Sequence, residues 1–460
     1  MRALQKAAMT RREHFQKNIS LAWPVMLGQI GHVMVGLADS IMVGALGTVA
    51  LAAGAFANSV FVVPMVFGIG LAFGLTTPVA NADGEKKPEK ARSFLKHGIY
   101  LNTSIAILIF LLLIILERFL PYMGQEPEVL ATAKNYYRII SFSLVPLLTF
   151  LTFKQFAEGL SDTRVAMIIS VAANLLNIGL NYLLIYGYWG LPALGLEGAG
   201  IATLISRIIM AVTMAIYVFR KPAFRIYTQG IQWGQTKWAH FKLLLDIGVP
   251  SGLQFIFEVS AFALAAVMAG WFNAESLAAH QIAISLASVS YMAASGIGAA
   301  ANVRVSNQLG AGNIPAMRMA AHTNFVLMLI FMGIAGLVFF FGRNYLPTFY
   351  SEDPAVIALA SKLLIVAVAF QLFDGMQVAV LAALRGLSET RIPTLIVMIS
   401  YWIIAMGTSY YLGFKMELGA IGIWYGLALG LIVASCLLTW RFEIRSRQLL
   451  REHHEHQPES

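Results

Sequence analysis

Long runs of apolar residues, separated by short polar segments, fill almost the whole chain. Each run is roughly 20 residues or longer, the length that an α-helix needs to cross the about 30 Å of hydrocarbon in a bilayer. The runs are continuous and do not alternate with polar positions, so they predict membrane helices and not the strands of an outer-membrane barrel. The predicted spans are 18–43, 51–79, 94–116, 133–153, 163–187, 197–219, 241–270, 277–301, 317–341, 355–383, 392–412 and 418–440.

Composition supports a membrane protein. Of the 460 residues, 58% are hydrophobic and only 12% are charged, which is more apolar surface than a soluble core of this length needs. The gaps between the runs are too short for a large soluble domain. We therefore expect an all-α polytopic membrane protein with twelve transmembrane helices.

The basic residues predict how the chain is oriented. They gather in alternate gaps, at 1–17, 86–96, 220–242 and 441–451, whereas the gaps 44–50, 188–196 and 271–276 hold no Lys or Arg. Because Lys and Arg accumulate in cytoplasmic loops, both termini are expected in the cytoplasm of a cell whose inner membrane holds the protein. Topology thus explains the net charge of +9 without a nucleic-acid partner.

The N-terminal segment and the cysteine content each exclude one class of feature. The first apolar run is long enough to span, and no small-residue cleavage site follows a short apolar core, so no removable signal peptide is expected. A single cysteine, Cys436, excludes an internal disulfide and a cysteine-based metal centre.

The chain repeats itself. Gly159–Arg164 reads GLSDTR and Gly386–Arg391 reads GLSETR, an offset of 227 residues (386 minus 159), and Pro24 and Pro250 keep nearly the same offset. Six spans lie in each copy, so both copies enter the membrane in the same direction, as in transporters that bind a solute between two halves. The expected parts are a cytoplasmic N-terminus 1–17, six-helix bundles at 18–219 and 241–440, a cytoplasmic linker at 220–240 and a cytoplasmic tail at 441–460.

Pro24 and Pro250 each lie within the opening span of their half. A proline there removes one backbone hydrogen bond and clashes with the preceding turn, which favours a kink or hinge. The alternative is an ordinary membrane-helix proline, since Gly and Pro are common in such helices.

Three carboxylic acids fall inside predicted spans: Asp39 in the first, Glu258 in the seventh and Asp374 in the tenth. A charge at the bilayer centre costs at least about 2.5–3.5 kcal/mol, so such groups face a cavity or a partner. A cation- or proton-binding role therefore competes with an ion pair or hydrogen bond that locks helices together.

Polar and aromatic residues share the helix faces of two of these acids. Glu258 follows Gln254 and Phe255 by about one turn, and Asp374 is flanked by further polar and aromatic residues at helical spacing. Such faces would be unstable against lipid and should line an internal cavity for cations and substrate. The flanking residues of Asp374 are Phe370, Gln371 and Gln377.

Three amides form a similar stripe in the fifth span. Asn174, Asn177 and Asn181 recur at i, i+3 and i+7. With Asp39 they would make a cation or proton site; as neutral hydrogen-bonding groups they would instead hold helices together. Sodium coordination is conceivable at Glu258, Asp374 or Asp39, and proton uptake is the alternative.

Two further ionisable residues lie within spans. His32, seven residues before Asp39 on the same face, titrates near neutral pH in its ordinary state. Arg207 in the sixth span would pair with a carboxylate or reach toward the interface. The sequence assigns neither a definite role.

Several strings resemble one transporter family. Asp39–Gly47, DSIMVGALG, resembles the first-helix signature of the multidrug and toxic compound extrusion (MATE) family. Ala279–Ala283, AHQIA, and Val303–Asn313, VRVSNQLGAGN, resemble its eighth-helix and loop signature. The resemblance covers 18–440, is strongest to the NorM-like branch, and implies two six-helix bundles in a V shape.

The resemblance also implies a function and its residues. Members of this family export mostly cationic drugs and dyes in exchange for sodium ions or protons. The positions of Glu258 and Asp374 belong to a cation site in the C-terminal bundle, and those of Asp39, Asn177 and Asn181 to a second site in the N-terminal bundle. Some relatives have an aspartate in place of Asn181, which leaves the ion preference of the second site open.

We therefore expect a monomeric secondary multidrug antiporter that uses sodium ions or protons, works by alternating access of its bundles, and needs no cofactor. A lipid-linked oligosaccharide flippase of the same superfamily is the alternative, although such proteins usually present a cationic cavity and the charges found here are mainly acidic. A polytopic membrane enzyme is disfavoured because the chain has no His-Glu-x-x-His and no Gly-x-Gly-Asp string.

Overall fold

The computed structural model describes residues 9–455, and it confirms the twelve predicted spans as helices long and apolar enough to cross a membrane. No strand occurs within 9–455. In the first half the helices are α1 (Arg11–Gly44), α2 (Thr48–Ala72), α3 (Thr76–Gly84), α4 (Pro88–Leu116), α5 (Pro127–Phe142), α6 (Leu144–Gly159), α7 (Arg164–Tyr186) and α8 (Gly195–Arg220).

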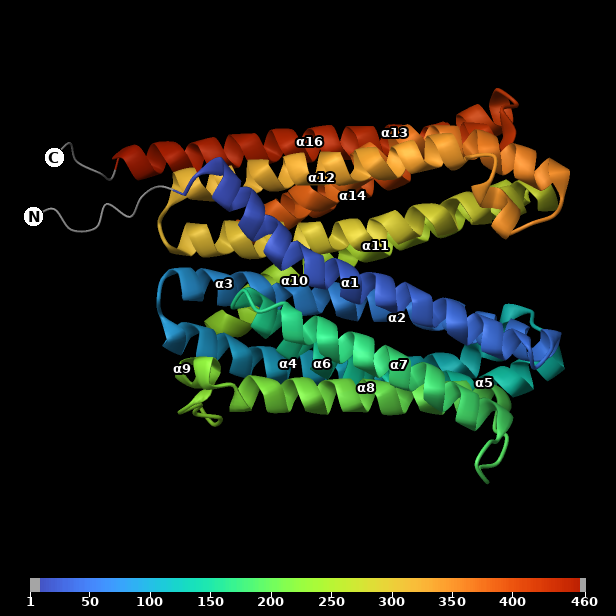
Figure 1. The fold of residues 1–460 in the computed structure, drawn as a ribbon, viewed down its shortest axis with the longest axis horizontal. Coiled ribbons are helices and arrows are strands. Elements are labelled where there is room, and N and C mark those ends of the chain that lie inside the picture. Colours follow the sequence, from blue (N-terminus) through green and yellow to red (C-terminus); the bar gives the residue numbers. More distant parts are fainter. Residues whose placement is uncertain (1–8, 456–460) are drawn as a thin grey trace, which may run out of the picture. The chain divides into compact units, whose positions relative to one another are not determined.

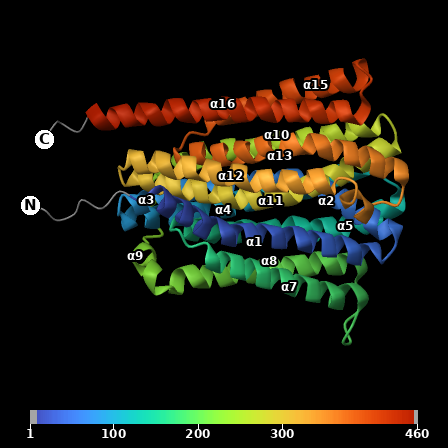
Figure 2. The ribbon, with the colours of Figure 1, turned by 45° about the horizontal axis from the view of Figure 1, so that its top comes forward.

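A short helix, α9 (Arg225–Thr228), lies in the linker between the halves. The helices of the second half are labelled in Figure 1, except α15, which is labelled in Figure 2. They are α10 (Trp238–Gly270), α11 (Ala274–Gly310), α12 (Ile314–Gly342), α13 (Pro354–Gly386), α14 (Arg391–Met398), α15 (Met406–Tyr410) and α16 (Gly419–Glu455). Two π-helical stretches, η5 (Ile399–Ala405) and η6 (Tyr411–Lys415), flank α15 and complete the eleventh span with α14.

The last helix is longer than its apolar run. The predicted span ended at residue 440, whereas α16 continues to Glu455. Arg, Glu, Gln and Leu dominate this continuation, and these residues favour helix without needing a hydrophobic partner. Glu443 and Arg447 also pair across one turn, at 3.5 Å.

Contacts divide the described residues into two compact units. One contains 9–26, 84–86 and 253–455, and the other contains 27–83 and 87–252. The chain therefore passes from one unit to the other within α1 and again within α10, two residues after Pro24 and Pro250 respectively. The predicted bundles at 18–219 and 241–440 and the predicted linker stay a prediction, and the hinge role of the prolines does too.

Small residues let the helices of the last two spans pack closely. Gly422, Gly426 and Gly430 recur every fourth position of α16 and so form one stripe on its surface. A Cβ atom on Gly426 would lie 2.2 Å from the Ser409 side-chain oxygen and 2.3 Å from its backbone nitrogen. Figure 2 shows α15 beside the N-terminal part of α16. Because Gly426 has no side chain, the two helices can approach this closely.

The repeated GLS-acid-TR loops have the same conformation in both halves. Ser161 and Ser388 occupy equivalent positions, and both have left-handed backbones, with φ of 64° and 59°. The next residue in each loop is the acid. Each acid pairs with two side chains four residues apart near the end of the sixth span of its own half.

Asp162 accepts from the Tyr217 hydroxyl and the Lys221 ammonium, both at 2.5 Å. Burial lowers the pKa of Lys221, but the hydrogen bonds to Asp162 and Tyr217 outweigh it and hold this pKa above its ordinary value. Glu389 pairs in the same way with Arg441 and, at 3.8 Å, with Arg445. The repeat thus conserves a structural clamp between a loop and a helix end.

Candidate functional site

Two buried acidic side chains stand out in the second half of the chain. Glu258 projects from α10 and Asp374 from α13, and both are buried, with 8% and 3% of their surfaces exposed. Their charges lie close enough to repel each other. Both acids lie within candidate membrane spans.

Each acid has a different hydrogen-bonding environment. Glu258 lies near the hydroxyl of Tyr291, on α11. Asp374 Oδ1 and Gln377 Oε1, one turn apart on α13, are buried without a hydrogen-bond partner among the described residues. Both atoms are acceptors, so this position favours a proton, a metal cation or a cationic group over any anion.

A π-helical stretch helps to form this site. Tyr401 lies within η5 and is almost fully buried, and Gln377 Nε2 donates to its hydroxyl at 3.1 Å. π-helical turns shift the following side chains relative to a regular α-helix and occur often at functional sites. Tyr291 and Tyr401 were not predicted as site residues. Tyrosine is common in apolar runs, and the sequence of one span does not show which residue of another helix its hydroxyl contacts.

The other predicted amides of this half bind neighbouring helices. Gln371 exchanges hydrogen bonds of 2.8 and 2.6 Å with Ser290 of α11. Gln254 donates to Thr394 of α14 at 3.0 Å and accepts from Arg385 at 3.4 Å. These two glutamines therefore position the helices that hold the acids.

The predicted aromatic residues have different surroundings. Phe370 is 1% exposed and packs against Phe262 and Trp424, with ring centroids 6.0 and 5.4 Å away. Phe262 also contacts Tyr401. Phe370 thus supports the site from within the core, whereas Phe255 is only half-buried on α10.

A second polar cluster lies in the first half. Asn181 Nδ2 donates to Asp39 Oδ1 and to Asn177 Oδ1, the latter at 3.3 Å. Asn177 continues the series by donating to Thr203 of α8 at 3.4 Å. The amide stripe of α7 is therefore joined to α1 and α8, and Asn174 is the member whose Nδ2 is buried with no partner in the described part of the chain.

Arg207 and His32 belong to the same unit as Asp39. Arg207 donates to Ser143 at 2.6 Å, lies over the Phe61 ring at 5.7 Å, and attracts Asp39 electrostatically. Ser143 and the Phe61 ring are therefore the contacts that hold the Arg207 side chain. The His32 side chain is exposed.

No group of three or more His, Cys, Asp or Glu side chains suited to a metal ion occurs among the described residues. A cation at either cluster would therefore depend on one or two carboxylates together with amide and hydroxyl oxygens. Sodium accepts such hard, neutral oxygens, whereas zinc and other transition metals favour imidazole and thiolate.

Comparison with known proteins identifies the family. The MatE family model matches residues 24–183 and again 250–411, so the two matches begin at the repeated prolines. The chain is 34% identical over 443 residues to the probable multidrug resistance protein NorM of Mesorhizobium japonicum, covering 95% of each protein. It is 33% identical to the protein of that name in Pseudomonas putida, covering 94% of this chain and 95% of the relative.

Solved structures share the fold. An outward-facing multidrug resistance MATE family transporter of the MOP superfamily superimposes with a TM-score of 0.89 at 20% identity, covering 98% of this chain and 99% of that one. A eukaryotic MATE transporter, AtDTX14, gives a TM-score of 0.85 at 22% identity, covering 96% and 99%. The chain is therefore a multi-pass membrane protein of the MatE family, a family of transporters and not of enzymes, and it is similar to the NorM proteins over nearly its whole length.

Proposed function

We propose that this protein exports cationic amphipathic drugs and dyes from the cell by antiport with sodium ions or protons. The single observation that carries the proposal is the pair of buried acids Glu258 and Asp374. Asp374 Oδ1 and the neighbouring Gln377 Oε1 have no hydrogen-bond donor among the described residues. Two carboxylates would repel an anionic solute from this environment. The names of the NorM relatives, which refer to multidrug resistance, support a drug substrate.

Coupling requires that the ion and the drug compete. When the acids bind an incoming cation or proton, they no longer attract a cationic drug, and the drug is released. The ion must also bind the two access states with different affinity, because equal affinity shifts no equilibrium; moving a population from 1:99 to 99:1 needs a difference of about 10⁴-fold. The second cluster, at Asp39 and the asparagines of α7, is the proposed N-terminal ion site.

The proposed setting is the cell membrane, with both termini in the cytoplasm and the protein acting as a monomer. The basic segments at 86–96, 220–242 and 441–451 support this orientation. The acidic character of Glu258 and Asp374 argues against a flippase for lipid-linked pyrophosphates, which would need a cationic cavity.

Dye efflux from proteoliposomes tests the proposal. Vesicles loaded with ethidium receive an inward sodium gradient or a pH gradient, each imposed alone. Efflux should accelerate with one of them, which also identifies the coupling ion. Dye movement that ignores both gradients would show that the protein is not such an antiporter.

Variants of the acids localise the activity. Glu258→Gln and Asp374→Asn should fold but lose gradient-driven efflux, whereas Glu352→Gln should retain it, since Glu352 is exposed just before α13. Wild-type transport by both site variants would remove the pair from the mechanism.

A further inference from the structure

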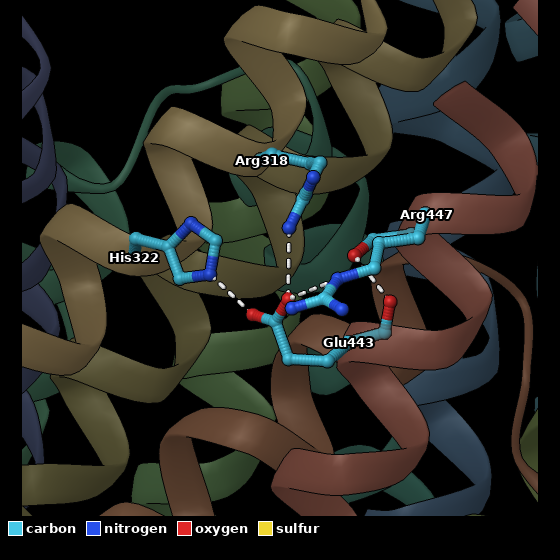
Figure 3. Close-up of polar contacts among 5 residues, drawn as sticks. Arg318, His322, Glu443 and Arg447 are labelled. Carbon is cyan, nitrogen blue, oxygen red and sulfur yellow. Dashed lines mark hydrogen bonds and ion pairs between the residues drawn. The ribbon is translucent and has the colours of Figure 1, made fainter. Parts of the chain in front are cut away.

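A charged cluster outside the proposed transport site joins α12 to the end of α16. Glu443 accepts from three basic side chains: Arg318 Nη2 lies 2.8 Å and Arg447 Nε 3.5 Å from its Oε2, and His322 Nε2 contacts its Oε1. Figure 3 shows the three basic groups converging on this one carboxylate. Two permanently charged guanidinium groups share a single negative charge, so the cluster keeps a surplus of positive charge.

One donor of this cluster is not used. Arg318 Nε is buried and has no hydrogen-bond partner among residues 9–455. Arg447, by contrast, is 66% exposed and is held in place by Glu443. The cluster therefore presents donors and positive charge beyond what its own acid requires.

An apolar groove of about 670 Å³ begins at this cluster and runs over α13 between α12 and α16. All its lining residues belong to one compact unit. Glu443 and Arg447 line its charged end. The rest of its wall is mainly apolar and includes Leu329, Leu372, Phe373, Met376, Cys436 and Trp440.

The length of the groove matches one leaflet of a membrane. From Ser435 to Arg447 the axis of α16 rises about 18 Å, at 1.5 Å per residue, and half of the hydrocarbon core is about 15 Å thick. Trp440 is 64% exposed in this segment. Tryptophans concentrate at the membrane–water interface, which places Glu443 and Arg447 at the level of the lipid head groups.

We propose that the groove binds an acyl chain of an anionic phospholipid whose phosphate pairs with Arg447 and Arg318. The apolar wall receives the chain, and the surplus charge selects the head group. Glu443 has a positioning role, because it lines the mouth of the groove and holds Arg447 there, with Arg318 on its other side. The neighbouring Arg441 and Arg445 pair with Glu389, and neither of them is among the residues that line the groove.

The sole cysteine of the sequence supplies a probe, since Cys436 is exposed and lines the groove. The full-length protein in neutral detergent is titrated with phosphatidylglycerol or with phosphatidylcholine of the same chains, and the rate at which N-ethylmaleimide modifies Cys436 is followed by mass spectrometry. Phosphatidylglycerol should slow the reaction at a lower concentration than phosphatidylcholine does.

Charge variants test the head-group contact. Arg447→Gln should weaken protection by phosphatidylglycerol about fivefold, the fold-change equal to about 1 kcal/mol for one basic residue near an anionic lipid. Arg447→Lys should retain most of it. Arg445→Gln is the matched control. Arg445 lies two residues before Arg447 and pairs with Glu389, so this variant removes the same charge and should behave as wild type.

Each other outcome would overturn the proposal. Equal protection by both lipids would show that the groove does not recognise the head group, and no protection would show that lipid does not occupy it. Protection by ethidium but not by lipid would make the groove a drug site. Equal losses in Arg447→Gln and Arg445→Gln would reduce the effect to general surface charge. The assay needs no transport, so its result is separate from that of the efflux experiment.

Discussion

Asp374→Asn should stabilise the ion-free protein while abolishing its stabilisation by the coupling ion. In the wild type, Asp374 lies close to the like charge of Glu258, and its Oδ1 and the Oε1 of Gln377 are buried acceptors without a donor among the described residues. An asparagine removes the repulsion, and its NH₂ group is a donor for Gln377 or Glu258. The substitution changes almost no volume.

The size of the effect follows from the unpartnered acceptor. Leaving one buried polar group unsatisfied costs about 1–3 kcal/mol, so the variant should gain at least about 1 kcal/mol in the absence of the ion. Against this, the wild type gains about 2.7 kcal/mol when the ion is present at 100 times its dissociation constant. The order of stability should therefore reverse as the ion is added.

Thermal unfolding in detergent measures both quantities. Tryptophan fluorescence is followed in alkaline choline buffer, in the same buffer with sodium, and at lower pH. The wild type should unfold at a higher temperature with its coupling ion, and Asp374→Asn should start higher and not respond. Glu352→Gln should respond as the wild type does. An Asp374→Asn protein that is less stable than wild type without ions and still responds to them would refute the assignment of Asp374 as an ion ligand.

Three further predictions test the first-half cluster and the scaffold. Asp39→Asn should fold but lose gradient-driven dye efflux roughly tenfold or more, because a hydrogen bond to a charged group is worth about 1.5–3 kcal/mol; unchanged efflux would exclude this ion site. Glu389→Gln should lower the unfolding free energy by about 1 kcal/mol through its partly exposed pairing with Arg441, measured by thermal unfolding, with transport per folded molecule retained. Gly426→Val should cost about 1–3 kcal/mol or more by clashing with Ser409; a variant as stable as wild type would show that the helices are not so closely packed.

The helices were predictable because the bilayer imposes one rule on every span. Lipid offers no hydrogen bonds, so a long apolar run must satisfy its backbone as a helix, and each predicted run is a helix here. The ends were less certain where polar residues continue a helix, as after residue 440. The repeat was equally visible, because the loop sequences GLSDTR and GLSETR are nearly identical. In the structure both loops have a left-handed serine, and Asp162 and Glu389 make equivalent pairings.

The candidate site was only partly visible. An acid within an apolar run is rare enough to be noticed alone, which is why Glu258, Asp374 and Asp39 were predicted. Helical spacing grouped the glutamines with Asp374 but could not tell which of them faces it: Gln371 binds Ser290, and Gln377 binds Tyr401. Spacing within one helix gives no register between helices.

By itself, then, the sequence determined the number of spans, the duplication, the family resemblance and the acids that membrane burial makes conspicuous. Only the tertiary structure decided that Asn181 binds Asp39, that Gln377 binds the π-helical Tyr401, and that Arg207 donates to Ser143. The physical reason is that hydrophobic burial and backbone hydrogen bonding act along a single helix, whereas partners are set by the packing of helices distant in the sequence.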